Sequence, residues 1–321
     1  MYIVTGGAGF IGANIVAGLN QRGERDVLVV DNLKNSSKFI NLRDLFFADY
    51  LDKSVFREQL LQGKFERQPI TAIFHQGACS DTMEYDGRYM MDNNFAWSRD
   101  LFQFAIARRI PLIYASSAAT YGDSLCFTEA PANERPLNVY GYSKLLFDRY
   151  VQRHYQQLES TVVGLRYFNV YGPRERYHKG RMASMCYQLY RQLRDTGVAK
   201  LFGGSGGYGD GEQRRDFIYV RDLVQLNLFL AEPRAQPLYG VFNAGTGQSR
   251  SFNDIASTLI TILGQGKVEY LPMPESLRDK YQSFTEADMS QLRQQTGYDQ
   301  PFTSLEEGLR DYVRQLLEQE S

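Results

Sequence analysis

Tyr2-Ile-Val-Thr-Gly-Gly-Ala-Gly-Phe-Ile-Gly12, near the start of the chain, runs from a short apolar strand into a turn rich in glycine. A helical pattern follows the turn. Gly6 permits the tight turn, Gly9 lets the backbone approach a pyrophosphate, and Gly12 lets the helix pack closely on the strand. The N-terminus of that helix would direct its N–H groups at the phosphates. The order of strand, turn and helix therefore predicts a dinucleotide-binding site.

A second apolar run, Val27-Leu-Val-Val-Asp31, ends in an acidic residue. An acid about 20 residues beyond the glycine turn is where such sites bind a ribose hydroxyl, so Asp31 favours NAD. Asn32, Lys34, Lys38 and Lys53 follow it, and the lysines could hold the 2′-phosphate of NADP by charge. On these residues the choice between NAD and NADP stays open.

The next strand signal, Ala72-Ile-Phe-His75, leads into the small residues of Gln76-Gly-Ala-Cys-Ser80. Small residues after a strand let the backbone lie close to a ligand, here the ribose and phosphates of the cofactor. We expect His75 to be packed and hydrogen-bonded, and Cys79 to be a small packing residue, since no base is evident beside it. Residues 89–107 predict a long helix in which an asparagine faces the cofactor.

Leu112-Ile-Tyr-Ala115 predicts another strand, and Ser116 and Ser117 follow it. A hydroxyl at the carboxyl end of a parallel strand lies where open α/β sheets bind ligands. Further on, Tyr140-Gly-Tyr-Ser-Lys144 places a tyrosine and a lysine on one face of a helix. The ammonium is expected to lower the pKa of Tyr140, which would then accept the proton of an alcohol undergoing oxidation.

The alternation of strands and helices predicts an α/β fold, a Rossmann-type doubly wound parallel sheet with right-handed crossovers. We expect residues 1–170 to form the NADP-binding domain, completed by a returning strand and helix from about residues 215–247. The alternation fades in residues 171–321, which we expect to form a smaller α+β substrate lobe interleaved with the first domain. There the glycine loop 202–211 precedes Arg215, whose guanidinium fork would suit a diphosphate.

The composition excludes several classes of protein. The net charge is -1, with 36 basic and 37 acidic residues, so no basic excess points to nucleic acid or an acidic membrane surface. Cys79, Cys126 and Cys186 have neither CxxC spacing nor a histidine cluster, which predicts no metal site and no disulfide framework. We expect no secretory leader, because the first residues lead straight into a strand, and no stretch has the length of a membrane span. We expect a cytoplasmic enzyme with reduced thiols.

Four motifs occur in order along the chain: the glycine turn, residues 116–122, residues 140–144 and residues 166–174. Together they resemble the nucleotide-sugar branch of the extended short-chain dehydrogenase/reductase superfamily over nearly the whole chain. Within that branch the chain closely resembles the ADP-L-glycero-D-manno-heptose 6-epimerase family, which completes the nucleotide-heptose precursor of the lipopolysaccharide inner core. Five stretches carry this narrower resemblance: residues 30–34, 75–80, 89–94, 115–122 and 136–144.

The resemblance implies NADP as cofactor, with NAD as the alternative, an ADP-sugar as substrate, and a homo-oligomer, which is a pentamer in the family. The implied cofactor-binding residues are Gly6, Gly9, Phe10, Ile11, Gly12, Asp31, Asn32, Lys38, Lys53, Gln76, Gly77, Ala78, Cys79, Ser80, Asn93, Lys144, Val170 and Lys179. The implied substrate-binding residues are Ser117, Asn169, Arg181, Gln188, Phe202, Gly203, Gly204, Ser205, Arg215 and Tyr281.

Inverting a carbon that carries only a hydroxyl requires the C–H to leave and to return on the other face. Transient oxidation to a ketone by NADP achieves this, and two acid/base groups then serve the two faces. Tyr140 is one, tuned by Lys144 and assisted by Ser117, which would hydrogen-bond the reacting oxygen. The resemblance implies Lys179 as the other. A lysine acts as a base only if desolvation or nearby cations lower its pKa, and the expected cations are the nicotinamide, Arg174, Arg176 and Arg181.

The chain departs from the family pattern in its second half. Arg181 stands where a serine is usual, Gln188 where a histidine is usual, the stretch around Lys179 is one residue longer, and the loop 205–215 is longer. These departures affect the prediction of which sugar is bound more than the prediction of the reaction type. The alternatives are a UDP- or GDP-hexose 4-epimerase and, from another class, a non-catalytic NADP-binding sensor. A dehydratase is disfavoured because residues 117–119 lack the Asp-Glu pair that expels water.

Overall fold

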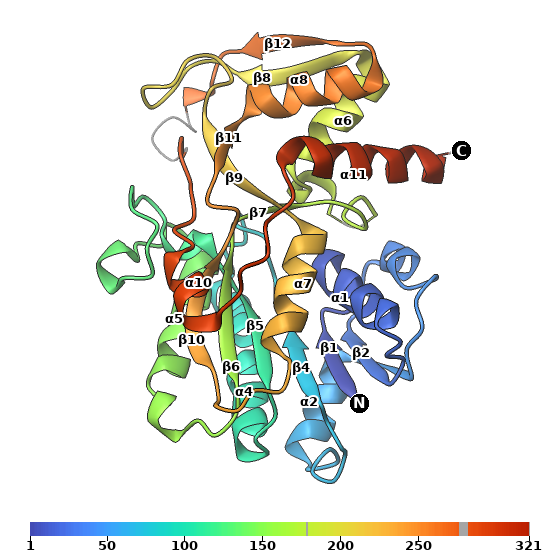
Figure 1. Ribbon diagram of the computed structural model, residues 1–321, viewed down its shortest axis with the longest axis vertical. Helices are drawn as coiled ribbons and strands as arrows, with labels where there is room; N and C mark the ends of the chain where they lie inside the picture. The colour runs from blue at the N-terminus through green and yellow to red at the C-terminus, as the bar shows by residue number, and fades with distance from the viewer. Residues whose placement is uncertain (178, 276–281, 321) are drawn as a thin grey trace.

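The computed structural model describes residues 1–177, 179–275 and 282–320, which form a large α/β domain with a smaller lobe above it (Figure 1). Across the described residues, seven parallel strands form the large sheet in the order β10-β6-β5-β4-β1-β2-β3. The order reverses at β1 and β4, as it does in a doubly wound sheet. The predicted fold class is therefore confirmed. The strands are β1 (Tyr2–Thr5), β2 (Val27–Asp31), β3 (Asp49–Asp52), β4 (Ala72–His75), β5 (Leu112–Ser117), β6 (Val162–Tyr167) and β10 (Tyr239–Ala244).

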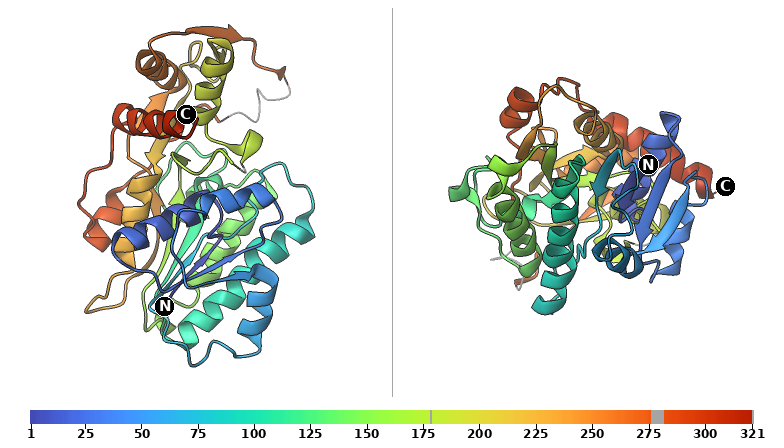
Figure 2. Two further views of the ribbon diagram at one scale, coloured as in Figure 1. Left: turned by 90° about the vertical axis from the view of Figure 1, so that its right-hand side faces the viewer. Right: turned by 90° about the horizontal axis from the view of Figure 1, so that it is seen from below.

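Helices cover both faces of this sheet (Figure 2). Alternate strand residues point to opposite faces, so Val4 and Val29 pack in one core while Ile3 and Leu28 pack in another. The first core includes α1 (Phe10–Gln21) and α7 (Val220–Leu230), which contact each other. The second core lies under α2 (Lys53–Leu61), α4 (Trp97–Ala107) and α5 (Val139–Gln152).

The smaller lobe has its own apolar core, to which Leu189, Ile255 and Leu309 belong. The chain enters the lobe after β6 and leaves it between β9 and α7, so that α7 and β10 lie in the large domain. Near the end of the chain, α10 (Ser290–Thr296) returns to the large domain and packs beside β10. The elements of the lobe are β7 (Asn169–Tyr171), α6 (Met185–Thr196), β8 (Val198–Phe202), β9 (Arg214–Tyr219), β11 (Ser249–Ser251), α8 (Phe252–Leu263), β12 (Lys267–Leu271) and α11 (Leu305–Glu320).

Arg166 on β6 is fully buried and joins the strands of the large sheet to α5. Its Nε donates to Asp148 Oδ2 at 3.2 Å, its Nη2 donates to Glu134 Oε1 at 2.5 Å, and its guanidinium lies over the Tyr121 ring, 5.0 Å from the centroid. Ser116 Oγ, at the end of β5, also donates to Asp148 at 2.8 Å. These bonds fix α5, which carries Tyr140, against β5 and β6.

Candidate active site

A cavity of about 640 Å³ lies at the carboxyl ends of the strands, where ligands bind in doubly wound sheets. The glycine turn, the segment after β4, the start of α5 and the loop before α6 all contribute to its lining. The structure thus brings together residues that lie far apart in the chain. All of the predicted cofactor residues line it: Gly6, Gly9, Phe10, Ile11, Gly12, Asp31, Asn32, Lys38, Lys53, Gln76, Gly77, Ala78, Cys79, Ser80, Asn93, Lys144, Val170 and Lys179.

The glycine turn is too crowded to hold larger residues. A Cβ on Gly12 would lie 2.1 Å from the carbonyl oxygen of Gly6, and a Cβ on Gly6 would lie 2.7 Å from the backbone nitrogen of Gly77. Gly9 caps α1 without any side-chain hydrogen bond, so the first N–H groups of the helix face the cavity without a protein side chain over them. This arrangement fits a dinucleotide pyrophosphate, which is held by a helix N-terminus.

Asp31 at the end of β2 has protein partners on both carboxylate oxygens. Oδ2 accepts the N–H of Ala8 at 3.0 Å, and Oδ1 accepts the N–H of Asn32 at 2.7 Å. Lys38 Nζ also donates to Oδ1 at 2.7 Å and forms an ion pair with it. The carboxylate expected to bind a ribose is therefore already neutralised by Lys38, at the position where the 2′-hydroxyl or 2′-phosphate of a dinucleotide would lie.

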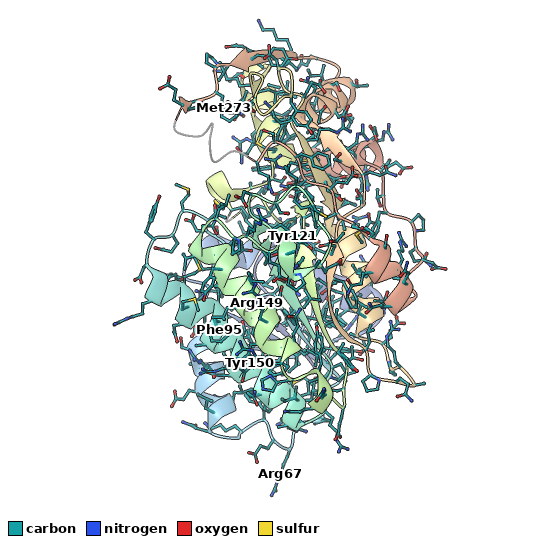
Figure 3. All side chains as sticks on the ribbon, turned by 90° about the vertical axis from the view of Figure 1, so that its left-hand side faces the viewer. Arg67, Phe95, Tyr121, Arg149, Tyr150 and Met273 are labelled. Atoms are coloured by element: carbon teal, nitrogen blue, oxygen red, sulfur yellow. The ribbon has the colours of Figure 1, made fainter. Side chains whose placement is uncertain are left out.

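Beyond Asp31, the predicted helix over residues 89–107 is interrupted by a π-helical turn. It consists of α3 (Gly87–Met90), the turn Met91–Ala96 and α4, and π turns occur frequently at functional sites. Asn93 in this turn accepts a hydrogen bond from Lys53 Nζ and faces the cavity, as one asparagine was expected to do. Phe95 packs edge to face on Tyr150 of α5 at a centroid distance of 5.9 Å (Figure 3), which joins the turn to α5.

His75 is buried and neutral rather than an acid/base candidate. Nδ1 lies 2.6 Å from Thr5 Oγ1, and Nε2 lies 2.8 Å from Ser98 Oγ. Burial, and secondarily the charge of Lys144, lowers its pKa to about 3. The expectation of a packed, hydrogen-bonded histidine agrees with this environment. Cys79 lines the cavity, and its N–H donates to Asn94 Oδ1 at 2.8 Å.

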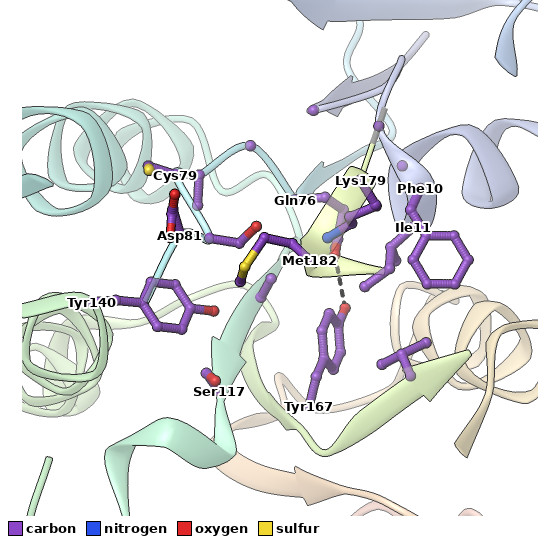
Figure 4. Close-up of a pocket in the computed structure, with 18 of the residues that line it drawn as sticks. Phe10, Ile11, Gln76, Cys79, Asp81, Ser117, Tyr140, Tyr167, Lys179 and Met182 are labelled. Atoms are coloured by element: carbon purple, nitrogen blue, oxygen red, sulfur yellow. Dashed lines mark hydrogen bonds between the residues drawn. The ribbon is translucent and has the colours of Figure 1, made fainter. Parts of the chain in front are cut away.

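Tyr140 lies in the first turn of α5. Asn138 caps this helix, and its Oδ1 accepts the N–H of Gly141 at 2.8 Å. A Cβ on Gly141 would lie 2.5 Å from the carbonyl oxygen of Ala119, so glycine lets α5 approach the turn that follows β5. That approach brings the Tyr140 phenol towards Ser117 across the floor of the cavity (Figure 4). The local sequence, a cap followed by glycine, thus sets the position of the candidate catalytic tyrosine.

The expected effect of Lys144 on Tyr140 is not what the structure shows. Burial raises the pKa of Tyr140, while its hydrogen bond with Ser117 lowers it, and the net direction is upward. Lys144 Nζ donates instead to the carbonyl oxygen of Ala115 at 2.7 Å, and burial lowers the pKa of Lys144 to about 8. The expectation was wrong because burial affects both groups more strongly than their spacing along one helix face does.

Lys179 reaches the cavity from the opposite side to Tyr140 (Figure 4). Burial lowers its pKa, Glu175 raises it, and Lys38 lowers it further. The direction agrees with expectation, but the expected cations are engaged elsewhere. Arg174 donates to the carbonyl oxygen of Asn41 at 2.5 Å and to both carboxylate oxygens of Asp44, and Arg176 pairs with Glu320 at 3.8 Å. The side chain of Arg181 lies outside the described residues.

Of the ten predicted substrate residues, two line the cavity, six of the described ones do not, and Tyr281 and the side chain of Arg181 lie outside the described residues. Ser117 and Asn169 line the cavity. Gln188 belongs to α6 and donates to the carbonyl oxygen of Ala183 at 2.7 Å. Tyr281 lies outside the described residues. Within the described part of the chain, the remaining five do not line this cavity: Phe202, Gly203, Gly204, Ser205 and Arg215.

The glycine loop is held by its own hydrogen bonds. The N–H of Gly204 donates to Asp210 Oδ1 at 2.7 Å, and Gln213 Nε2 donates to the carbonyl oxygen of Gly203 at 2.8 Å. Arg215, in β9, lies over the Phe252 ring at 5.7 Å from its centroid. These bonds order the loop within the smaller lobe, and its expected contact with a diphosphate stays a prediction.

Several lining residues were missed by the sequence argument. Tyr167 ends β6, and its hydroxyl donates to Gln76 Oε1 at 2.9 Å, as the dashed line in Figure 4 shows. Its place at the carboxyl end of a predicted strand was a usable signal. Asp81, Glu175 and Met182 also line the cavity, and their loops offered no such signal. Among the described residues, no group of three or more His, Cys, Asp and Glu side chains could hold a metal ion, and no helix is long and apolar enough to cross a bilayer.

Comparison with known proteins agrees with this geometry. Residues 2–245 match the NAD dependent epimerase/dehydratase family. The chain is 55% identical over 313 residues to the ADP-L-glycero-D-manno-heptose-6-epimerase of Alkalilimnicola ehrlichii, covering 98% of this chain and 96% of that protein. The crystal structure of the Helicobacter pylori ADP-L-glycero-D-manno-heptose-6-epimerase is 34% identical with a TM-score of 0.85, over 98% of this chain and 96% of that one. The Thermotoga maritima UDP-glucose 4-epimerase with UDP-glucose is 29% identical with a TM-score of 0.79, over 98% and 99%.

Proposed function

The chain belongs to the NAD-dependent epimerase/dehydratase family, and we propose that it inverts C6 of ADP-D-glycero-D-manno-heptose to give ADP-L-glycero-D-manno-heptose. The product would serve the heptose of the lipopolysaccharide inner core. The observation that carries this proposal is that Tyr140 and Lys179 face one cavity from opposite sides, beside a dinucleotide turn. The Alkalilimnicola and Helicobacter relatives support the choice of sugar.

Two opposed proton carriers suit inversion of a carbinol carbon. A bound nicotinamide cofactor would take the hydride of C6 and return it to the other face of the resulting ketone. Tyr140 takes or gives the hydroxyl proton on one face, with Ser117 holding the reacting oxygen, and Lys179 does so on the other. Lys144 orients the cofactor ribose at the same end of the cavity. In one turnover one group accepts the hydroxyl proton and the other donates a proton to the new hydroxyl, so proton exchange with solvent restores both groups before the next turnover.

We propose NADP rather than NAD as the cofactor. Lys38 neutralises Asp31, whose charge would otherwise repel a 2′-phosphate, and Lys53 lies at the same end of the cavity. Burial lowers the pKa of Lys53, and a phosphate beside it would favour the charged form. We also propose a cytoplasmic homo-oligomer of the kind that the family resemblance implies, which light scattering on the purified protein would test.

The experiment is to incubate the purified protein with ADP-D-glycero-D-manno-heptose and to follow the C6 epimer by NMR. Wild-type protein is expected to bring the two epimers to equilibrium with no added oxidant. Tyr140→Phe and Lys179→Met should each lower kcat by about 10²- to 10⁴-fold, because each removes one proton carrier. Both variants should still bind NADP, since neither substitution touches the glycine turn.

Tyr142→Phe is the matched control, because Tyr142 is an exposed phenol in the same helix, and it should keep wild-type activity. Turnover of UDP-glucose or a GDP-hexose without conversion of the ADP-heptose would replace the proposal with a 4-epimerase. Binding of NADP with no turnover of any of these sugars would point to a non-catalytic sensor. Full activity in Lys179→Met would remove Lys179 from the mechanism.

A further inference from the structure

The loop that carries Lys179 runs from β7 to α6, and one buried carboxylate connects its two ends. Glu175 is only 1% exposed. Its Oε1 accepts the N–H of Gly172 at 3.3 Å and the hydroxyl of Ser184 at 2.8 Å, and its Oε2 accepts the N–H of Ser184 at 2.7 Å. Gly172 follows β7 directly, and Ser184 caps α6. Glu175 therefore closes the segment 172–184 into a ring that includes Lys179.

Several groups around Glu175 favour its ionised form and oppose the net rise in its pKa that burial causes. Donors reach both carboxylate oxygens, and the N-terminus of the 12-residue helix α6 lies against them. Burial raises the pKa of Glu175, and the bonds from Ser184 and Gly172 oppose that rise. The other titratable groups that face it are Cys186 of α6 and Tyr312 of α11.

The ring is fastened to the large domain at its outer edge. Asn14 Nδ2 of α1 donates to the carbonyl oxygen of Pro173 at 2.9 Å, and Arg174 donates to Asn41 and Asp44. Arg174 has a φ of 74°, a left-handed conformation that a non-glycine residue adopts only when its contacts hold it. The loop thus has fixed ends and a fixed edge, with Lys179 facing the cavity between them.

Lys179 is surrounded by charges from several elements. Lys38 approaches from the segment after β2, and its own charge is paired with Asp31. Arg174 and Arg176, on the same loop, are paired with Asp44 and with Glu320 of α11. Against burial and Lys38, Glu175 is the carboxylate that favours the charged amine of Lys179. Burial and a neighbouring cation both disfavour the charged amine, so a carboxylate beside it helps the amine to hold a proton.

We propose that Glu175 is a positioning residue for Lys179: its carboxylate closes the loop that carries the amine and supplies the negative charge that lets the amine both accept and donate a proton. This inference rests on the proposed function, because it assigns Glu175 a part in the acid/base cycle of Lys179. Glu175 itself bonds to the backbone and to Ser184, so it acts through Lys179.

The test compares pH–rate profiles of Glu175→Gln and wild-type protein in both directions of the epimerisation. Removing the negative charge lowers the pKa of Lys179, so the limb that reports this amine should move to lower pH by roughly 1 unit. In the direction in which the neutral amine accepts the proton, Lys179 determines the acidic limb of the pH–rate profile. In the direction in which the ammonium donates the proton, Lys179 determines the alkaline limb. The loosened loop should also lower kcat by about 10- to 100-fold, with little change in NADP binding.

Two further variants separate charge from structure. Glu175→Asp keeps the charge. It should lower kcat while leaving the limb of the pH–rate profile that reports Lys179 within about 0.3 pH units of wild type. Asp44→Asn removes an exposed carboxylate from the tether of the same loop and should leave the limb in place. A Glu175→Gln protein that folds and binds NADP but keeps the wild-type limb would overturn the inference, even with a lower kcat. Failure of wild-type protein to epimerise the heptose would instead contradict the proposed function.

Discussion

At the scale of single residues, the ion pair of Lys38 with Asp31 is the basis on which we propose NADP as the cofactor. The ammonium cancels the charge of Asp31, the residue that would favour NAD. Lys38→Gln removes both that neutralisation and a donor for the 2′-phosphate. We expect affinity for NADP to fall roughly 10- to 100-fold, and affinity for NAD to change far less. Fluorescence titration with the two cofactors measures this ratio.

Lys34→Gln is the control for that substitution, because Lys34 is exposed and its side chain is outside the cavity lining. It should leave the preference between the two cofactors unchanged. Equal weakening of NADP and NAD in Lys38→Gln would mean that Lys38 only keeps Asp31 in place. In that case the choice of cofactor would rest with Lys53 and Asn32.

At the scale of single elements, α5 shows how a helix cap can control catalysis. Asn138 Oδ1 accepts the N–H of Gly141, and Tyr140 lies between them in the first turn. Asn138→Ala should cost about 1 kcal/mol of stability, which is typical for a lost cap. Fraying of this turn also moves the Tyr140 phenol, so kcat should fall by about 10-fold or more. Thermal unfolding and steady-state kinetics measure the two effects.

The cap of α8 provides a matched control for α5. Ser251 caps that helix in a capping box with Asp254, inside the smaller lobe and outside the cavity lining. Ser251→Ala should lower stability by a similar amount, about 1 kcal/mol, and leave kcat unchanged. If both variants lost activity in proportion to their stability, the position of Tyr140 would not depend on its cap.

At the scale of the whole molecule, acid unfolding should depend strongly on His75. Burial holds its pKa at about 3 in the folded protein, while an unfolded histidine has a pKa near 6.5. Between these values the unfolded chain binds one more proton than the folded one. The contribution of His75 is therefore fully present above pH 6.5 and is lost as the pH falls, by about 1.4 kcal/mol per unit.

Urea unfolding at several values between pH 6.5 and pH 4.5 measures this slope. His75→Gln keeps hydrogen-bonding groups between Thr5 and Ser98 but removes the titration, so its stability should fall less steeply with pH than that of wild type. Identical slopes for His75→Gln and wild type would show that His75 binds its proton in the folded state as readily as in the unfolded one.

The sequence predicted more of the large domain than of the smaller lobe. The glycine turn and the predicted strands with their small residues placed the cofactor side of the cavity correctly, because spacing and residue size determine local backbone geometry. The diphosphate contact expected of the loop 202–211 stays a prediction, because the conformation of this loop depends on bonds to Asp210 and Gln213 and on the packing of the smaller lobe, which residue spacing does not reveal. Arg166 belongs to a motif of the resemblance, yet its part in a buried ion-pair network became visible only in three dimensions.

The sequence by itself determined the class of fold, the dinucleotide turn and the place of Tyr140 and Lys144 on one helix. These features depend on residues that are close in the chain, where periodicity and steric size act directly. Only the tertiary structure decided that Lys179 faces Tyr140, that Glu175 joins the ends of its loop, and that burial governs the pKa values of these groups. Desolvation and contacts between distant segments arise only when the two parts of the chain close around one cavity.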